Sequence, residues 1–109
     1  MPSKELVLQT AGLIQKDFYF EDLANLLPNE ETPGFDLLKR QLARRISQML
    51  DEDFGILMQI FYRIDLNEQK VKDAIAIAEE PAERLAELVL EREMQKAKTR
   101  MEYRNRNKE

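Results

Sequence analysis

Any chemistry in this chain would have to be built from carboxylates, arginines and tyrosines. Its 109 residues include no histidine, no cysteine and only three glycines. Most enzymatic sites that work near neutral pH use histidine, cysteine, a metal held by these residues, or a glycine-rich phosphate loop. We therefore expect a protein that is not an enzyme and that holds no metal, no cofactor and no small-molecule substrate.

The densest cluster of reactive side chains is formed by Tyr62, Arg63, Asp65 and Glu68. Two carboxylates can divide acid and base roles, as they do in glycoside hydrolysis. However, an acceptor followed three residues later by glutamate is also a variant of the capping box that opens a helix. The chain has no tryptophan to form a broad sugar platform. We therefore interpret Asp65 as the N-cap of a helix rather than as a catalytic group.

A second acidic cluster, residues 51–55, superficially resembles a calcium-binding loop. Its glycine comes one position too early, and Tyr62 stands where the closing glutamate would be needed. A carboxylate-bridged pair of metal ions in a helical bundle would need Glu-x-x-His motifs, and this chain has no histidine. The acidic cluster is better suited to the start of a helix, where the dipole favours negative charge.

Apolar residues recur every three or four positions, which predicts helices through most of the chain. The first segment, from Lys4 to Ile14, fits a helix, although residues 6–8 could instead begin a strand. A short helix is expected over residues 21–27, and two prolines and a glycine predict a loop over residues 28–34. An amphipathic helix follows from Phe35 to Met49. The remaining helices are expected over residues 54–64, from the Asp65 cap to Ala78, and from Pro81 onward.

The segment from Phe54 to Ile64 differs from the others because eight of its eleven residues are apolar. A helix that is apolar nearly all round lies at the centre of a core or is covered by a partner. The central position is the first expectation, and a covered dimer face is the alternative. The fold class is therefore all-α: a compact array of four to six helices around this central helix, with a long C-terminal helix. Residues 1–109 form one domain, in which residues 98–109 are a solvated helix end or a frayed tail.

Charge is unevenly distributed around a net value of −4. Residues 21–36 carry five acidic side chains and no basic one, whereas residues 96–109 carry six basic side chains. Phosphate binding requires clustered cations more than any motif. A nucleic-acid-binding module is therefore the alternative function, with the basic tail and Lys39, Arg40, Arg44 and Arg45 as phosphate contacts.

The last helix gives the leading functional hypothesis. It is long and charged, and its apolar stripe thins beyond Met94. Helices that extend past their own core often pack on a partner, commonly a second copy. We therefore expect a non-enzymatic protein–protein interaction or small structural or adaptor protein, with self-association as one form of that interaction. The candidate interaction surface comprises Glu87, Glu91, Met94, Lys98, Met101 and Arg104.

A sequence pattern in the C-terminal two-thirds also bears on the origin of the chain. It consists of residues 60–65, Glu68, Lys70, Val71, residues 81–83, 85–86 and 90–92. The pattern resembles that of short, uncharacterised all-helical bacterial proteins, which implies a bacterial cytoplasmic protein and carries over no functional residue. The absence of cysteine fits a reducing compartment. No signal-peptide pattern and no membrane-length apolar run is apparent, so we expect a cytoplasmic protein without a membrane partner.

Overall fold

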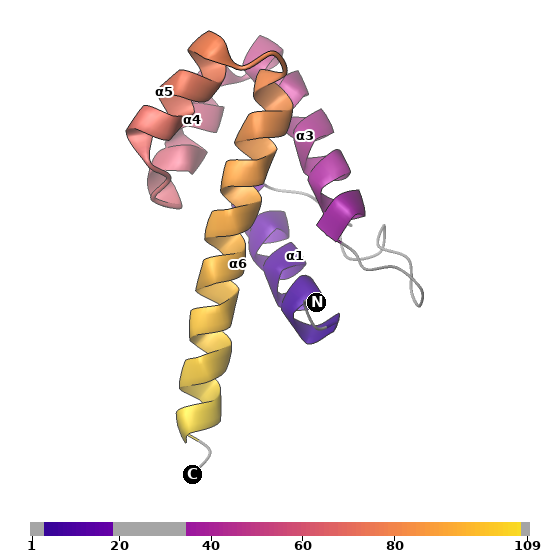
Figure 1. Cartoon of the computed structure of the whole chain (residues 1–109), viewed down its shortest axis with the longest axis vertical. Helices are drawn as coiled ribbons and strands as arrows, with labels where there is room; N and C mark the ends of the chain where they lie inside the picture. The colour runs from indigo at the N-terminus through magenta and orange to yellow at the C-terminus, as the bar shows by residue number, and fades with distance from the viewer. Residues whose placement is uncertain (1–3, 19–34, 108–109) are drawn as a thin grey trace.

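The computed structural model describes residues 4–18 and 35–107, and these residues form helices joined by short connections. Along the chain the helices are α1 (Lys4–Phe18), α3 (Phe35–Glu52), α4 (Phe54–Arg63), α5 (Glu68–Ile77) and α6 (Pro81–Asn107) (Figure 1). No strand occurs within the described ranges. The all-α prediction with a long C-terminal helix is therefore confirmed. The helix expected over residues 21–27 and the loop over 28–34 lie outside the described residues.

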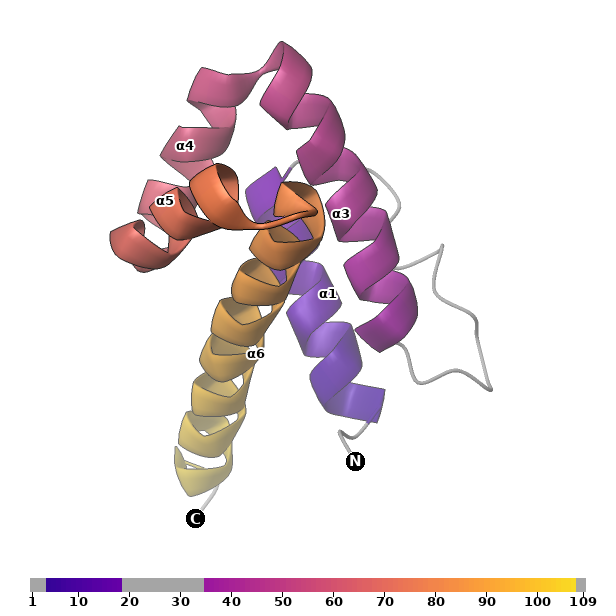
Figure 2. The ribbon, with the colours of Figure 1, turned by 45° about the horizontal axis from the view of Figure 1, so that its top comes forward.

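Helix α6 is the axis of the molecule. Its 27 residues span ~40 Å at about 1.5 Å per residue, and the longest dimension of the molecule is 46 Å. Helices α1, α3 and α5 all pack on α6. The two views in Figures 1 and 2 show α3 and α5 on opposite sides of its N-terminal half, with α1 beside its middle.

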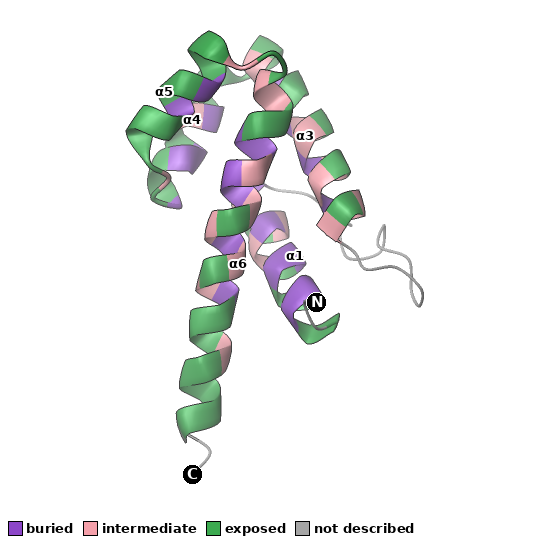
Figure 3. Cartoon of the chain, viewed as in Figure 1, coloured by how far each residue is buried: buried purple, intermediate pink, exposed green. Residues whose placement is uncertain are grey.

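The core lies where these helices meet the N-terminal half of α6 (Figure 3). The two helices predicted from Lys4 and from Phe35 supply much of it. Buried residues are Val7, Ala11, Ile14 and Phe18 from α1 and Leu38, Leu42, Ile46 and Met49 from α3. Opposite them, α6 buries Leu85, Ala86, Leu88 and Val89. The buried residues of α1 and α3 thus recur every three or four positions, as the sequence pattern predicts for amphipathic helices.

Helix α4 contributes to this core on one side only. Leu57, Ile60 and Phe61 are buried, whereas Tyr62 on the same helix is 84% exposed. Phe54 and Ile56 are each 48% exposed. The helix packs mainly on α3 and lies toward one end of the molecule. The central position expected for residues 54–64 therefore belongs to α6, which is long enough to contact three other helices.

The connection between α4 and α5 corrects the predicted N-cap. The cap of α5 is Asn67, whose side-chain Oδ1 accepts a hydrogen bond from the Lys70 amide at 3.0 Å. Asp65 instead has a φ of 63° and ends α4. Its amide donates to the Tyr62 carbonyl, and the Leu66 amide donates to the Phe61 carbonyl, each at 3.0 Å. This pair of bonds is a Schellman motif, which requires a left-handed residue at the position of Asp65.

The C-terminal part of α6 extends beyond its packing partners. The chain is helical through Asn107, and the side chains of residues 98–106 are exposed except for the half-buried Met101 (Figure 3). Within the described ranges, none of the helices combines the length and the apolar character that a membrane crossing requires.

Candidate interaction surface

A groove lies between α4 and α5, and the way in which the two helices are held explains it. Helix α5 packs on α6, whereas α4 packs on α3, so the two helices are held by different neighbours. The short connection at residues 64–67 joins them without extensive contact between their sides. A cavity of about 560 Å³ remains, which we call the α4–α5 groove. It is lined by Met58, Phe61, Tyr62, Asp65, Leu66, Asn67, Glu68, Val71 and Lys72.

The interior of the groove is apolar. Phe61 and Val71 are buried in its floor, and Met58 and Leu66 are half-buried. Phe61 is fixed from behind by an edge-to-face contact with Phe18, with ring centroids 6.4 Å apart. A floor of buried side chains in contact with the core gives a preformed surface for an apolar side chain.

Exposed apolar side chains continue this surface. Tyr62 lines the groove yet is 84% exposed. Phe54 precedes Met58 by one helical turn, and Ile75 follows Val71 by one turn, so spacing places both beside the groove. They are 48% and 37% exposed. The apolar floor of the groove and the exposed apolar side chains at its borders are features of the kind that mark interaction sites.

The rim of the groove carries both signs of charge. Asp65 and Glu68 supply carboxylates, and Lys72 supplies an ammonium group one helical turn after Glu68. Asp65 forms an ion pair with Arg92 of α6 at 3.6 Å. Arg92 also donates from Nε to the Ile64 carbonyl at 3.0 Å, which ties the end of α4 to α6. Asp65 and Glu68 thus lie at helix ends and, at the same time, on the rim of the groove.

The structure places the predicted α6 surface in different environments along the helix. Glu87 lies near α3, where it pairs with Lys39 at 3.2 Å and with Arg84 at 3.1 Å. The hydrogen bond from Lys39 is the main cause that lowers the pKa of Glu87, and Arg84 acts in the same direction. Arg104 pairs with Glu5 of α1. Two residues of the predicted surface thus have partners within the chain.

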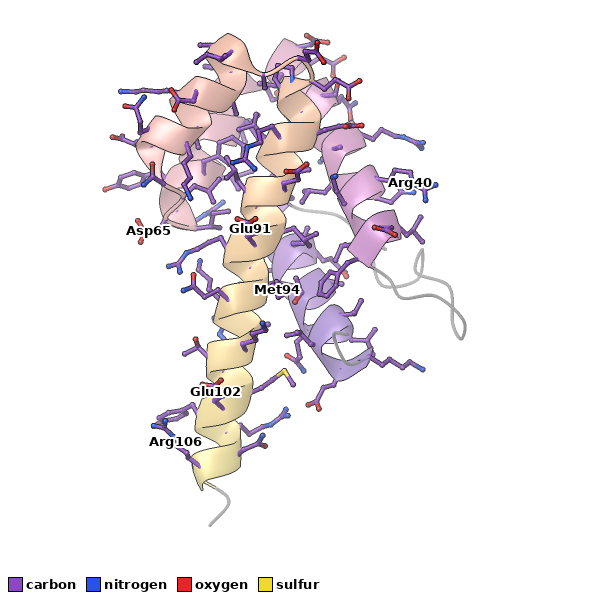
Figure 4. The ribbon with its side chains drawn as sticks, viewed as in Figure 1. Arg40, Asp65, Glu91, Met94, Glu102 and Arg106 are labelled. Carbon is purple, nitrogen blue, oxygen red and sulfur yellow. The ribbon has the colours of Figure 1, made fainter. Side chains whose placement is uncertain are left out.

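The other members of that surface divide by exposure. Met94 and Met101 are half-buried, and Met94 lies where α6 passes α1 (Figure 4). Glu91 and Lys98 are exposed. The exposed members are charged, so this stretch offers a partner less apolar area than the α4–α5 groove does.

The cations proposed as phosphate contacts are interleaved with carboxylates. Lys39 is engaged by Glu87, and Arg45 is half-buried with its Nε shielded from solvent. Arg40 and Arg44 are exposed, and Figure 4 shows Arg40 projecting from α3.

Arg40 and Arg44 line a second cavity, of about 730 Å³, between α3 and the start of α6. Asp36, Glu80 and Glu83 line the same cavity. A hydrogen bond with Glu83 and the charge of Glu83 raise the pKa of Glu80. Since Lys39 also lines this cavity, its three carboxylates balance its three cations, and no net positive charge is offered to a phosphate backbone.

Metal binding has no support from the described part of the chain. Those residues include no group of three or more histidine, cysteine, aspartate or glutamate side chains arranged to hold a metal ion. Asp51, Glu52 and Asp53 of the acidic cluster are all exposed.

Two features of the structure were missed by the sequence analysis. The first is the exposure of Tyr62 and Phe54, which an apolar pattern all round the helix does not reveal. The second is Glu93, which is completely buried. A signal for Glu93 exists in the sequence, because it interrupts the stripe of Leu85, Val89 and Ala97 at intervals of four.

Comparisons with protein-family models, with curated proteins and with solved structures found no match to this chain. The functional argument therefore rests on the residues of the α4–α5 groove.

Proposed function

We propose that this chain is a non-enzymatic interaction protein that associates with a second copy of itself through the α4–α5 groove. The observation that carries the proposal is the position of Tyr62, which is 84% exposed on the border of an apolar groove. Tyrosine combines a large apolar ring with a polar hydroxyl and is enriched among the residues that dominate binding energy at interfaces.

A second copy is the partner that this surface fits best. A two-fold interface must be self-complementary, because each copy presents the same patch to the other. The groove offers a cavity and, on its border, an aromatic side chain to fill the equivalent cavity. Its rim carries Glu68 and Lys72, so opposite charges can meet across a two-fold axis.

The proposal selects one of the expectations drawn from the sequence. The helix at residues 54–64 had a covered dimer face as its alternative role, and the one-sided burial of α4 supports that alternative. The proposal keeps the expectation that the chain is a small structural or adaptor protein of a bacterial cytoplasm. Nucleic-acid binding is less well supported, because acidic side chains accompany Arg40 and Arg44 in their cavity.

The proposal is tested by sedimentation equilibrium over a wide range of protein concentration. The unaltered chain should show a reversible monomer–dimer equilibrium. Tyr62→Glu should weaken association at least tenfold, about 1.4 kcal/mol, because a charge would enter the apolar groove of the partner. The exposure of Tyr62 predicts that this variant keeps the helical circular dichroism spectrum of the parent chain.

Tyr103→Glu is the matched control. Tyr103 is 67% exposed in the C-terminal part of α6, away from the groove. It should leave dimerisation unchanged. An unaltered chain that remains monomeric throughout the concentration range would contradict the proposal. Equal weakening by both substitutions would contradict the assignment of the groove as the interface.

A further inference from the structure

Glu93 is a carboxyl group in an environment that does not favour its charged form. Its side chain is completely buried in α6. Neither carboxylate oxygen accepts a hydrogen bond from any described donor. The Nζ of Lys96 lies 3.8 Å from Oε1, which is an ion-pair distance but too long for a hydrogen bond. A buried carboxylate with unsatisfied oxygens is costly, whereas the protonated form is not charged.

A second carboxyl group adds to this effect. Asp17, near the end of α1, lies close enough to Glu93 for its charge to act on that group, and a proton on either carboxyl would allow a side-chain hydrogen bond between them. Two ionised carboxylates cannot form that bond, because each would only accept. One proton between them turns the pair into a donor and an acceptor. The contact between α1 and α6 is therefore favourable when the two carboxyl groups share one proton. It is unfavourable when both are ionised.

We propose that docking of α1 on α6 is linked to a proton held by the Glu93–Asp17 pair, so that loss of this proton loosens α1. The position of the pair supports this link. Asp17 belongs to α1 and Glu93 to α6, and α1 packs mainly on α6. Separation of the two helices would expose Glu93 to water and remove the neighbouring carboxyl group.

The direction of the pH dependence follows from the environment of Glu93. Burial is the largest cause that raises its pKa, and Asp17 raises it further. Lys96 and Arg100, both on α6, act in the opposite direction. Together these effects raise the pKa of Glu93 from 4.5 to about 8.

Docking is therefore strongest at low pH and weakens as pH rises. Below a pH of about 4.5, Glu93 is protonated whether α1 is docked or open, so docking does not depend on this proton. Between that value and about 8, only the docked state retains the proton. The equilibrium constant for opening should then rise up to about tenfold per pH unit. Above this range both states are ionised, and the dependence levels off.

Amide hydrogen exchange, corrected for the intrinsic effect of pH on exchange, measures the opening of α1. Between about pH 6 and about pH 8 the opening constant of α1 in the full chain should rise by up to ~100-fold. Glu93→Gln should abolish this rise, because the amide is neutral at both values. Glu91→Gln is the matched control, since Glu91 lies on the same helix but is exposed, and it should retain the rise.

Asp17→Asn provides a second test that does not alter the buried side chain. Removal of the neighbouring charge should lower the pKa of Glu93 and reduce the pH response of α1. The proposal is overturned if α1 opening in the unaltered chain is independent of pH over this range, or if both substitutions leave the response unchanged. An equal response in α5 would also overturn it, because the proton would then be linked to unfolding of the whole chain.

Discussion

At the scale of single residues, the connection after α4 shows how one backbone angle decides the roles of its neighbours. Asp65 adopts a φ of 63°, which few residues other than glycine and asparagine or aspartate tolerate. This angle ends α4 in a Schellman motif and leaves Asn67 in position to cap α5. The spacing of Asp65 and Glu68 indicated a capping box at Asp65, but that spacing does not record the backbone angle that decides which residue begins the helix.

Asn67→Ala should lower the free energy of unfolding by about 1 kcal/mol, because the Lys70 amide would lose its side-chain acceptor. Urea denaturation measures this difference. Asn105→Ala, an exposed position within α6, is the control and should change stability little. An Asn67→Ala variant as stable as the parent would contradict the cap.

At the scale of elements, α4 shows which structural features an apolar sequence pattern predicts and which it does not. The pattern correctly predicted a helix that reaches the core, because Leu57 and Ile60 are buried. It could not predict which helix would be central, since this depends on how α3 and α6 pack on each other. The long α6 takes that place, and α4 is left with one apolar side exposed.

Two phenylalanines of α4 should therefore respond differently to truncation. Phe61 is 3% exposed and contacts Phe18, so Phe61→Ala should reduce the free energy of unfolding by about 3–5 kcal/mol. Phe54 is 48% exposed, and Phe54→Ala should cost less than about 1 kcal/mol. Thermal or urea unfolding distinguishes the two. Similar losses would mean that α4 is buried on both sides.

The candidate site was predicted less well than the fold, for a physical reason. Helical periodicity indicates which residues are apolar, but it does not show which of two adjacent apolar residues is buried. Phe61 and Tyr62 are adjacent in one apolar run, yet Phe61 is buried and Tyr62 is exposed. The residues proposed on α6 show the converse limit. Glu87 and Arg104 looked available to a partner because the pairing of Glu87 with Lys39, and of Arg104 with Glu5, joins residues that are distant in sequence.

At the scale of the whole molecule, α6 is the helix on which α1, α3 and α5 pack. Helix α1 lies beside the middle of α6, and α3 and α5 lie along its N-terminal half (Figure 1). Because α4 packs on α3 and α5 packs on α6, the groove between α4 and α5 opens at one end of the molecule (Figure 2). The C-terminal turns of α6 extend from the other end, so two copies can meet at the groove without obstruction by these turns.

The most direct test of this account is an isotope-filtered nuclear Overhauser experiment on a mixture of isotope-labelled and unlabelled chains. Such a mixture reports contacts between copies without any substitution. The account predicts intermolecular signals from the Tyr62 ring of one copy to the methyl groups of Leu66 and Val71 of the other. Intermolecular signals confined to the C-terminal turns of α6, or none at the highest attainable concentration, would contradict self-association through the α4–α5 groove.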